Sequence, residues 1–165
     1  MSGFDPARIL HALDAAGVQF ILIGGFATNV HGYERATADL DVCYERSRAN
    51  VERLVGVLRD LAARSRQWPE AVPFVLDPQT ILNGDTFTFD TDAGPLDILG
   101  TPSGSGGYRD LQRGAETIEL GERLLVQVVG LDDLIRLKRA AGRGKDLVDV
   151  AALEEIRALQ DKSPG

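Results

Sequence analysis

Two aspartates separated by a single residue, Asp39 and Asp41, are the side chains of this sequence whose spacing most directly suggests chemistry. In an extended strand, residues i and i+2 point to the same face, so both carboxylates would project together while Leu40 and Val42 face the other way. Carboxylates about 7 Å apart along a strand repel each other unless cations lie between them. The pair therefore predicts a site for divalent metal ions, and carboxylate oxygens suit Mg²⁺.

Two glycines upstream supply a complementary feature. Gly24 and Gly25 end the apolar run Phe20–Ile23, which has the length and composition of a strand. A short helix is expected over Phe26–Val30, and a strand that turns into a helix through two glycines lets backbone N–H groups approach a phosphate closely. Thirteen residues separate Gly25 from Asp39. Together the glycines and the aspartates predict a metal–triphosphate site.

The order of apolar strand, Gly-Gly, thirteen residues and Asp-Leu-Asp resembles the signature of the nucleotidyltransferase superfamily. The run from Gly32 to Asp41, GYERATADLD, is similar to bacterial AbiEii-type toxins and related uncharacterised nucleotidyltransferases. A second run, from Asp133 to Asp149, resembles the C-terminal signature of that subgroup, in which Lys-x-x-Ala precedes Arg-x-Lys-Asp-x-x-Asp. The resemblance spans about residues 18–153. It implies an α+β fold with a polymerase-β palm-like mixed sheet, flanking helices and C-terminal helices.

The same resemblance implies a third metal-binding carboxylate on a strand antiparallel to the Asp-x-Asp strand, and Asp97 matches it. Thr86–Phe89 alternates as a half-buried strand does, and Pro95–Leu99 is the expected return strand of a hairpin. A carboxylate inside a short apolar strand is locally inconsistent, which is typical of functional residues. A surface or hairpin-stabilising role for Asp97 is the alternative. Three other aspartates lie nearby in turns or at strand ends, where aspartate is common: Asp85, Asp90 and Asp92.

The implied reaction is the transfer of NMP from an NTP such as ATP to an acceptor hydroxyl, with release of pyrophosphate. Asp39, Asp41 and Asp97 would be the catalytic and metal-binding residues. All three would hold one Mg²⁺ ion that activates the acceptor, and Asp39 and Asp41 would share a second ion bridged to the triphosphate. The implied nucleotide-binding residues are Gly24, Gly25, Arg35, Thr37 and Lys138.

Lys138 lies in a local excess of cations, because five occur between Arg136 and Lys145 without an acid, in a chain of net charge −7. By analogy with the family, Lys138 would contact the nucleotide phosphates, and Lys145 could pair with Asp146 at a helix junction. Ordinary surface cations on a helix are the alternative. The family often has Gly-Ser where this chain has Gly24-Gly25, so a hydroxyl contact to phosphate would be missing here.

The acceptor is open between three classes. It would be a tRNA 3′ end if the chain is the toxin of a toxin–antitoxin pair, a protein hydroxyl, or a small molecule such as an aminoglycoside or lincosamide. A non-catalytic nucleotide-binding or antitoxin-like module that keeps the fold is the competing function. Clustered carboxylates cost stability without a metal, which argues against such a module. A cognate antitoxin or toxin protein would be a partner.

The remaining pattern predicts the elements that position these residues. Asp5 and Pro6 begin a helix that Gly17 ends. A long amphipathic helix is expected over Arg48–Arg66, followed by Trp68-Pro69 and a loop-rich stretch. Residues Thr101–Gly107 are a loop. Two strands and two helices complete the expected order: Glu116–Leu120, Leu124–Val129, Leu131–Ala140 and Asp146–Leu159, the last with Leu147, Val150 and Leu153 on its apolar face, before a frayed tail over 162–165.

Length and composition are those of a single globular domain over residues 1–165, with a core of about 18–130 and a C-terminal helical segment of about 131–160. No apolar run approaches the roughly 20 residues of a membrane span, and the first residues lack a secretory pattern. The single cysteine, Cys43, fits a reducing cytoplasm and a place in the core. We expect structural roles for His31, Phe26 and Tyr33.

Overall fold

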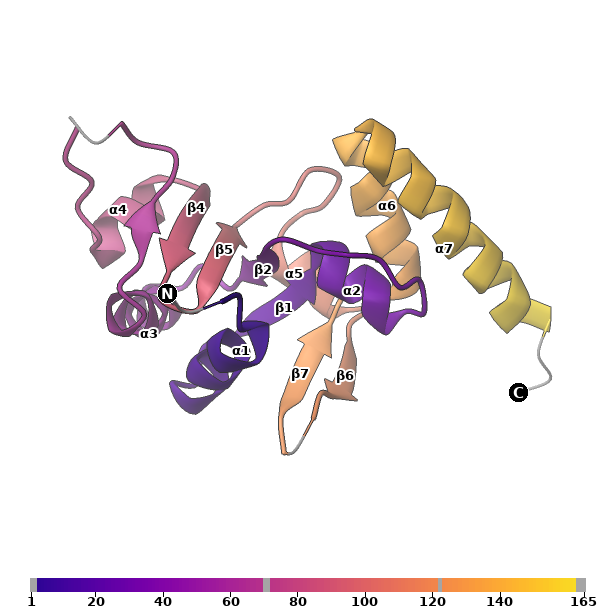
Figure 1. Cartoon of the computed structure of the whole chain (residues 1–165), viewed down its shortest axis with the longest axis horizontal. Coiled ribbons are helices and arrows are strands. Elements are labelled where there is room, and N and C mark those ends of the chain that lie inside the picture. The colour runs from indigo at the N-terminus through magenta and orange to yellow at the C-terminus, as the bar shows by residue number, and fades with distance from the viewer. Residues whose placement is uncertain (1–2, 70–71, 122, 163–165) are drawn as a thin grey trace.

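A computed structural model describes residues 3–69, 72–121 and 123–162 of the chain. Within them the strands form one mixed sheet in the order β3-β4-β5-β2-β1-β7-β6 (Figure 1). Neighbouring strands pair antiparallel except β5 with β2 and β1 with β7, which are parallel. The strands are β1 Phe20–Ile23, β2 Leu40–Tyr44, β3 Arg64–Ser65, β4 Thr86–Thr91, β5 Gly94–Leu99, β6 Glu116–Glu119 and β7 Leu125–Val128.

Helices lie around this sheet. They are α1 Pro6–Ala15, α2 Gly24–Val30, α3 Arg48–Asp60, α4 Pro78–Asn83, α5 Tyr108–Gln112, α6 Leu131–Ala141 and α7 Gly144–Lys162. In Figure 1, α3 and α4 lie beside β3 and β4 at one end of the molecule, whereas α6 and α7 pack together at the other. The predicted α+β class is confirmed, and none of the helices in the described ranges is both long and apolar enough to cross a membrane.

The centre of the sheet is the most deeply buried part of the molecule. All four residues of β1 are buried, as are four of the five in β2, with Asp41 the half-buried exception. Covered on both faces, these strands read as nearly continuous apolar runs in the sequence. A central strand of this kind is a rigid support, so the polar residues at its end are held by the core itself.

The predicted long helix is shorter than expected. α3 begins at Arg48, where Ser47 caps it, but ends at Asp60 rather than Arg66. Ala62 has a left-handed backbone with φ of 53°, and the chain then turns so that Arg64–Ser65 pairs with β4 at the edge of the sheet. Pairing the otherwise open edge of β4 outweighs continuation of the helix, because unpaired strand N–H and C=O groups are costly.

One short helix, α4, falls in the stretch that was expected to be rich in loops, and another, α5, follows the predicted loop over residues 101–107. α4 begins with Asp77 as its cap and Pro78 at its first position, the same start signal as Asp5 and Pro6 in α1. In α7 the predicted inward position of Leu147 is wrong, since its side chain is 54% exposed. The buried residues of α7 are Asp146, Asp149, Val150 and Leu153, so two carboxylates occupy its inner face.

The expected antiparallel direction between the two aspartate-bearing strands is also wrong. β5 is antiparallel to β4, as the predicted hairpin requires, but it lies next to β2 and runs parallel to it. The reason is the number of reversals between them: α3 returns the chain so that β3 runs in the direction of β2, β4 reverses that direction, and β5 reverses it again. The parallel register sets Asp41 directly beside Asp97.

Candidate metal and phosphate site

Three carboxylates meet where β2 begins. Asp41 lies on β2, Asp39 immediately precedes that strand, and Asp97 is the register partner of Asp41 on β5. Each offers one carboxylate oxygen, and these oxygens lie within 4.8 Å of one another. Opposite oxygens around a Mg²⁺ ion are about 4 Å apart, since each Mg–O distance is 2.0–2.1 Å. A small inward movement of the side chains would therefore suffice, and the all-oxygen donor set fits Mg²⁺.

The electrostatics of this cluster show how unfavourable it is without a cation. Burial, the charges of Asp39 and Asp97, and a hydrogen bond with Asp97 raise the pKa of Asp41 to about 7. Burial and the charge of Asp39 also raise the pKa of Asp97, although Arg66 acts against them. A carboxyl group that holds a proton near neutral pH reports that its neighbours provide too little positive charge. A bound metal cation would supply the missing positive charge.

The cation that does reach the cluster is Arg66, which sequence reasoning missed. It follows β3 directly, forms an ion pair with Asp97, and also lies 3.4 Å from Asp90. Arg66 was assigned to the end of a predicted helix, where its side chain would have pointed to solvent. Only the long-range pairing of β3 with β4 brings it to the site.

Neighbouring side chains pack so closely against the two predicted glycines that a larger residue would not fit. Gly24 follows β1 without a loop and has φ of 71°, and a Cβ atom there would lie 2.1 Å from Oδ2 of Asp41. A Cβ atom on Gly25 would lie 2.8 Å from Oγ1 of Thr37. Any side chain at either position would displace Asp41 or Thr37. The glycines therefore let the turn pack directly against the carboxylate cluster.

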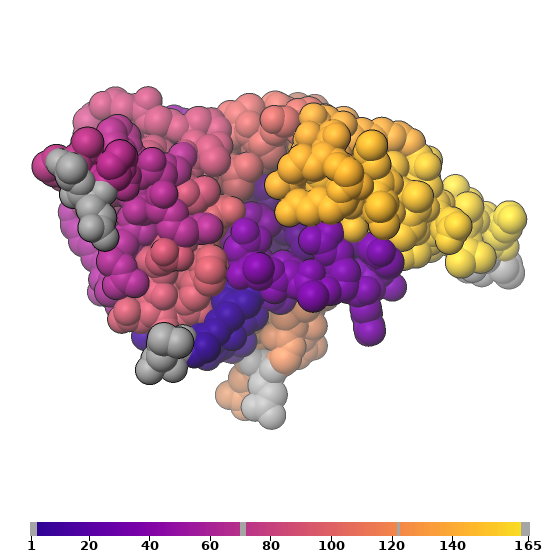
Figure 2. Space-filling view, turned by 45° about the horizontal axis from the view of Figure 1, so that its top comes forward, coloured from indigo at the N-terminus to yellow at the C-terminus, as the bar shows by residue number. Residues whose placement is uncertain are grey.

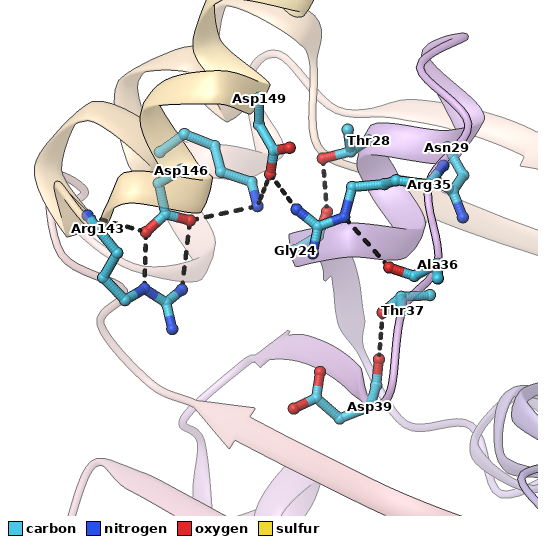
Figure 3. Close-up of polar contacts among 11 residues, drawn as sticks. Gly24, Thr28, Asn29, Arg35, Ala36, Thr37, Asp39, Arg143, Asp146 and Asp149 are labelled. Atoms are coloured by element: carbon cyan, nitrogen blue, oxygen red, sulfur yellow. Dashed lines mark hydrogen bonds and ion pairs between the residues drawn. The ribbon is translucent and has the colours of Figure 1, made fainter.

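The loop between α2 and β2 carries Arg35 and Thr37. Thr37 donates a hydrogen bond from Oγ1 to the backbone oxygen of Asp39 at 3.0 Å, and the backbone N–H of Arg35 donates to Oδ1 of Asn29 at 3.0 Å. The guanidinium of Arg35 lies 2.5 Å from Oδ2 of Asp149 on α7. These contacts hold the loop against both the aspartate cluster and the C-terminal helix (Figure 3).

A network of alternating charges joins α6 to α7. Asp149 accepts from Arg35 and from Lys138, whose Nζ is 2.9 Å away, and Lys138 also lies 3.6 Å from Asp146. Asp146 in turn accepts from the Nε of Arg143 at 2.7 Å. Burial alone would raise the pKa of Asp146, but hydrogen bonds and charge from Arg143, with the charge of Lys138, hold it below its usual value. We call these five residues the charge network (Figure 3).

The cluster, the two glycines and the three cations of the network line one cavity of about 370 Å³. Figure 2 shows the surface hollowed between the residues of α6 and α7 on one side and those of β4 and β5 on the other. The cavity is lined by residues from both sides and from the floor between them: Gly24, Gly25, Arg35, Ala36, Thr37, Ala38, Asp39, Asp41, Thr86, Asp97, Leu99, Lys138, Arg143 and Lys145. Every predicted site residue lines it.

Other expectations have mixed outcomes. Lys145 forms no ion pair with Asp146, which is taken by Lys138 and Arg143 among the residues that the structure describes. His31 contacts the backbone oxygen of Val129 through Nε2 at 2.7 Å, and Phe26 packs edge-on against Phe4, so both have structural contacts. Cys43 is buried, and burial raises its pKa to about 12, which excludes a reactive thiolate at neutral pH.

No family model and no curated protein matches the sequence. Solved structures do match: the lincosamide antibiotic adenylyltransferase LnuA with lincomycin bound has a TM-score of 0.63 at 16% identity, over 92% of this chain and 95% of that chain. A candidate nucleotidyltransferase from Thermotoga maritima has a TM-score of 0.53 at 12% identity, over 98% of both chains. The antibiotic-resistance factor ANT(2'')-Ia has a TM-score of 0.51 at 14% identity, over 94% and 92%.

These similarities show that the chain has the nucleotidyltransferase fold, as the sequence predicted. At such low identities they extend to the fold alone. The expected closeness to AbiEii-type proteins stays a prediction, as does the role of each site residue.

Proposed function

We propose that this protein is a Mg²⁺-dependent nucleotidyltransferase that transfers NMP from an NTP such as ATP to an acceptor hydroxyl and releases pyrophosphate. The observation that carries the proposal is the convergence on one cavity of three carboxylates, a side-chain-free turn and several cations. A buried carboxylate cluster with a raised pKa supports metal binding, and cations opposite it suit a polyphosphate.

Asp39, Asp41 and Asp97 would hold the metal, which neutralises the triphosphate and lowers the pKa of the acceptor hydroxyl when bound. We assign two Mg²⁺ ions, with Asp39 and Asp41 serving both and Asp97 serving the one on the acceptor side. Asp97 also accepts the acceptor's proton.

The wall of the cavity opposite the carboxylates would stabilise the leaving group, pyrophosphate. Arg35 and Arg143 line the cavity and balance charge as pyrophosphate departs. Gly24 and Gly25 leave the wall of the cavity open to the phosphates, because neither has a side chain. In this proposal Arg35, Thr37, Gly24 and Gly25 bind nucleotide, as their sequence positions suggested.

For the acceptor, we favour a small hydroxyl-bearing molecule. LnuA was solved with lincomycin bound and ANT(2'')-Ia is an antibiotic-resistance factor, and the chain's net charge of −7 disfavours a polyanion such as tRNA. A tRNA 3′ end, with a cognate antitoxin as partner, and a protein hydroxyl are the other acceptors to be tested. A cytoplasmic location would supply the NTP.

The test uses purified protein, Mg²⁺ and each α-³²P-labelled NTP with a lincosamide, an aminoglycoside, total tRNA and a cell extract as acceptors. We expect label transfer to a small molecule and its loss in Asp41→Asn. Transfer to tRNA instead would reassign the acceptor and favour the toxin role. Nucleotide binding without transfer to any of these would favour the non-catalytic module.

A further inference from the structure

Two lysines line the wall of the cavity opposite the carboxylates, Lys138 from α6 and Lys145 from the first turn of α7. Sequence reasoning assigned the phosphates to Lys138 and a structural ion pair to Lys145. Their surroundings in the fold suggest the reverse assignment, because it is Lys138 that is paired with carboxylates.

Lys138 is already neutralised. Its side chain is only 8% exposed, and Nζ lies between Asp149 at 2.9 Å and Asp146 at 3.6 Å, both of them buried. An ammonium group with two carboxylates close by has little net charge left to offer a phosphate. Moving it toward a ligand would leave two buried carboxylates with less compensation, which is strongly unfavourable.

Lys145 has the opposite environment. It lines the same cavity and is exposed, and it forms no ion pair within the described part of the chain. A cation in the first turn of a helix is also unfavourable, because the helix dipole is positive there. A residue placed against its local preference on a cavity wall points to a functional reason.

We propose that Lys145 is the side chain that binds the distal phosphates of the nucleotide, and that Lys138 is a positioning residue. Through Asp146 and Asp149, Lys138 fastens the first turns of α7 to α6 and so fixes Lys145 at the cavity. Arg143 supports Lys145 from the neighbouring position, since its guanidinium binds Asp146 on one edge yet is 62% exposed. This inference rests on the proposed function, because it assumes that the cavity takes a triphosphate.

The test measures equilibrium binding of ATP, ADP, AMP and inorganic tripolyphosphate by calorimetry with Mg²⁺, at two ionic strengths. Lys145→Ala should weaken ATP and tripolyphosphate binding tenfold or more, as expected for a lost charge-assisted hydrogen bond, and leave AMP binding nearly unchanged. Lys145→Arg should restore most of the affinity. Arg139→Ala is the matched control, because Arg139 pairs with Glu154 and does not line the cavity.

Lys138→Met should instead lower the melting temperature, and it should weaken ATP binding only by displacing Lys145, so that it adds little further loss of ATP affinity when combined with Lys145→Ala. The inference is overturned if Lys145→Ala binds ATP as the wild type does, or if Lys138→Met keeps its melting temperature and selectively loses ATP over AMP. Failure of the wild type to bind ATP or tripolyphosphate at all would sink the proposed function, which is a separate result.

Discussion

Two groups of aspartates lie near the same cavity, one lining it and the other paired with cations that line it, and they have opposite electrostatics. In the cluster, Asp41 and Asp97 have raised pKa values although Arg66 forms an ion pair with Asp97. In the charge network, Asp146 has a lowered pKa, and two carboxylates are matched by three cations. The two groups also differ in burial, since Asp146 and Asp149 are almost fully buried and the cluster carboxylates are only half-buried. The lowered pKa of the more deeply buried Asp146 therefore comes from its cationic partners.

That difference separates a site that awaits a ligand from one that is complete. Both carboxylates of the network are paired with cations, and its third cation leaves a net positive charge at the cavity. The cluster is short of positive charge, and only a bound cation would correct it. The charge network therefore acts as a structural support on one side of the cavity. The aspartate cluster on the other side has an excess of negative charge.

The largest effect should come from breaking the network. Asp149→Ala removes the shared partner of Arg35 and Lys138 and leaves a buried ammonium under-compensated. We expect the free energy of unfolding to fall by about 3–5 kcal/mol, measured by urea denaturation. Asp132→Ala is the control, since the pair of Asp132 with Arg157 is exposed and should matter by less than about 1 kcal/mol. Equal effects would mean that the network is no more than a surface feature.

The cluster should respond in the opposite way. Asp41→Asn removes a charge that is repelled by Asp39 and Asp97, so the metal-free protein should be as stable as the wild type or more so. Activity should nevertheless fall on the order of a hundredfold or more, because charge stabilisation of the transition state is lost. Label transfer and urea denaturation on the same preparations measure both. Near-normal transfer by a folded variant would contradict the metal reading.

Much of the cluster could be predicted because its signals are local. Gly24, Gly25, Asp39 and Asp41 lie within one short motif, and Asp97 stands out as a carboxylate in an apolar strand. The direction of β5 could not be predicted, since it depends on how many times the intervening chain reverses. Arg66 was hidden for a similar reason: the apolar periodicity of α3 runs past Asp60, and only strand pairing with β4 ends the helix.

The expected pairing of Lys145 with Asp146 could have been excluded from helix geometry. Lys145 and Asp146 are adjacent on α7, and adjacent residues on a helix do not face each other. Asp146 and Asp149 are three apart, so they share a face and reach Lys138 on α6 together. The helix α4 was also predictable, because Asp77 and Pro78 repeat the start signal of α1.

A pH titration tests the charge of the same cluster without changing a side chain. The folded pKa of Asp41, about 7, exceeds the unfolded value of about 3.9, so the metal-free folded state binds more protons between these values. Its stability should therefore fall as pH rises from about 4 to about 7 and level off above. Asp146, with its lowered pKa, should give the opposite slope below about pH 4.

Urea denaturation across this range, with a chelator present, tests the sign. Asp41→Asn should lose most of the slope between pH 4 and 7 and keep the slope below it. Saturating Mg²⁺ should reverse the slope near neutral pH in the wild type, because metal and protons compete for the same carboxylates. A wild-type protein that gains stability from pH 4 to 7 without metal would contradict the cluster's unbalanced charge.

The smallest effect should come from Arg66, which forms an ion pair with Asp97 of the cluster. Arg66 and a metal ion compete for Asp97, so Arg66→Met should strengthen Mg²⁺ or Mn²⁺ binding. The guanidinium is about one-third exposed and screened by water, which limits the gain to several-fold, or less than about 1 kcal/mol. Arg64→Met is the matched control, because it removes the same charge from the same edge of the sheet, and among the described residues Arg64 forms no ion pair with Asp97. Calorimetric metal titration of both variants separates local competition from long-range repulsion.

If Arg66→Met instead binds metal more weakly while Arg64→Met does not, Arg66 holds Asp97 in the geometry that the ion requires. Arg66 would then be a positioning residue within the cluster. The difference in function between the two walls of the cavity would be smaller than their charges suggest.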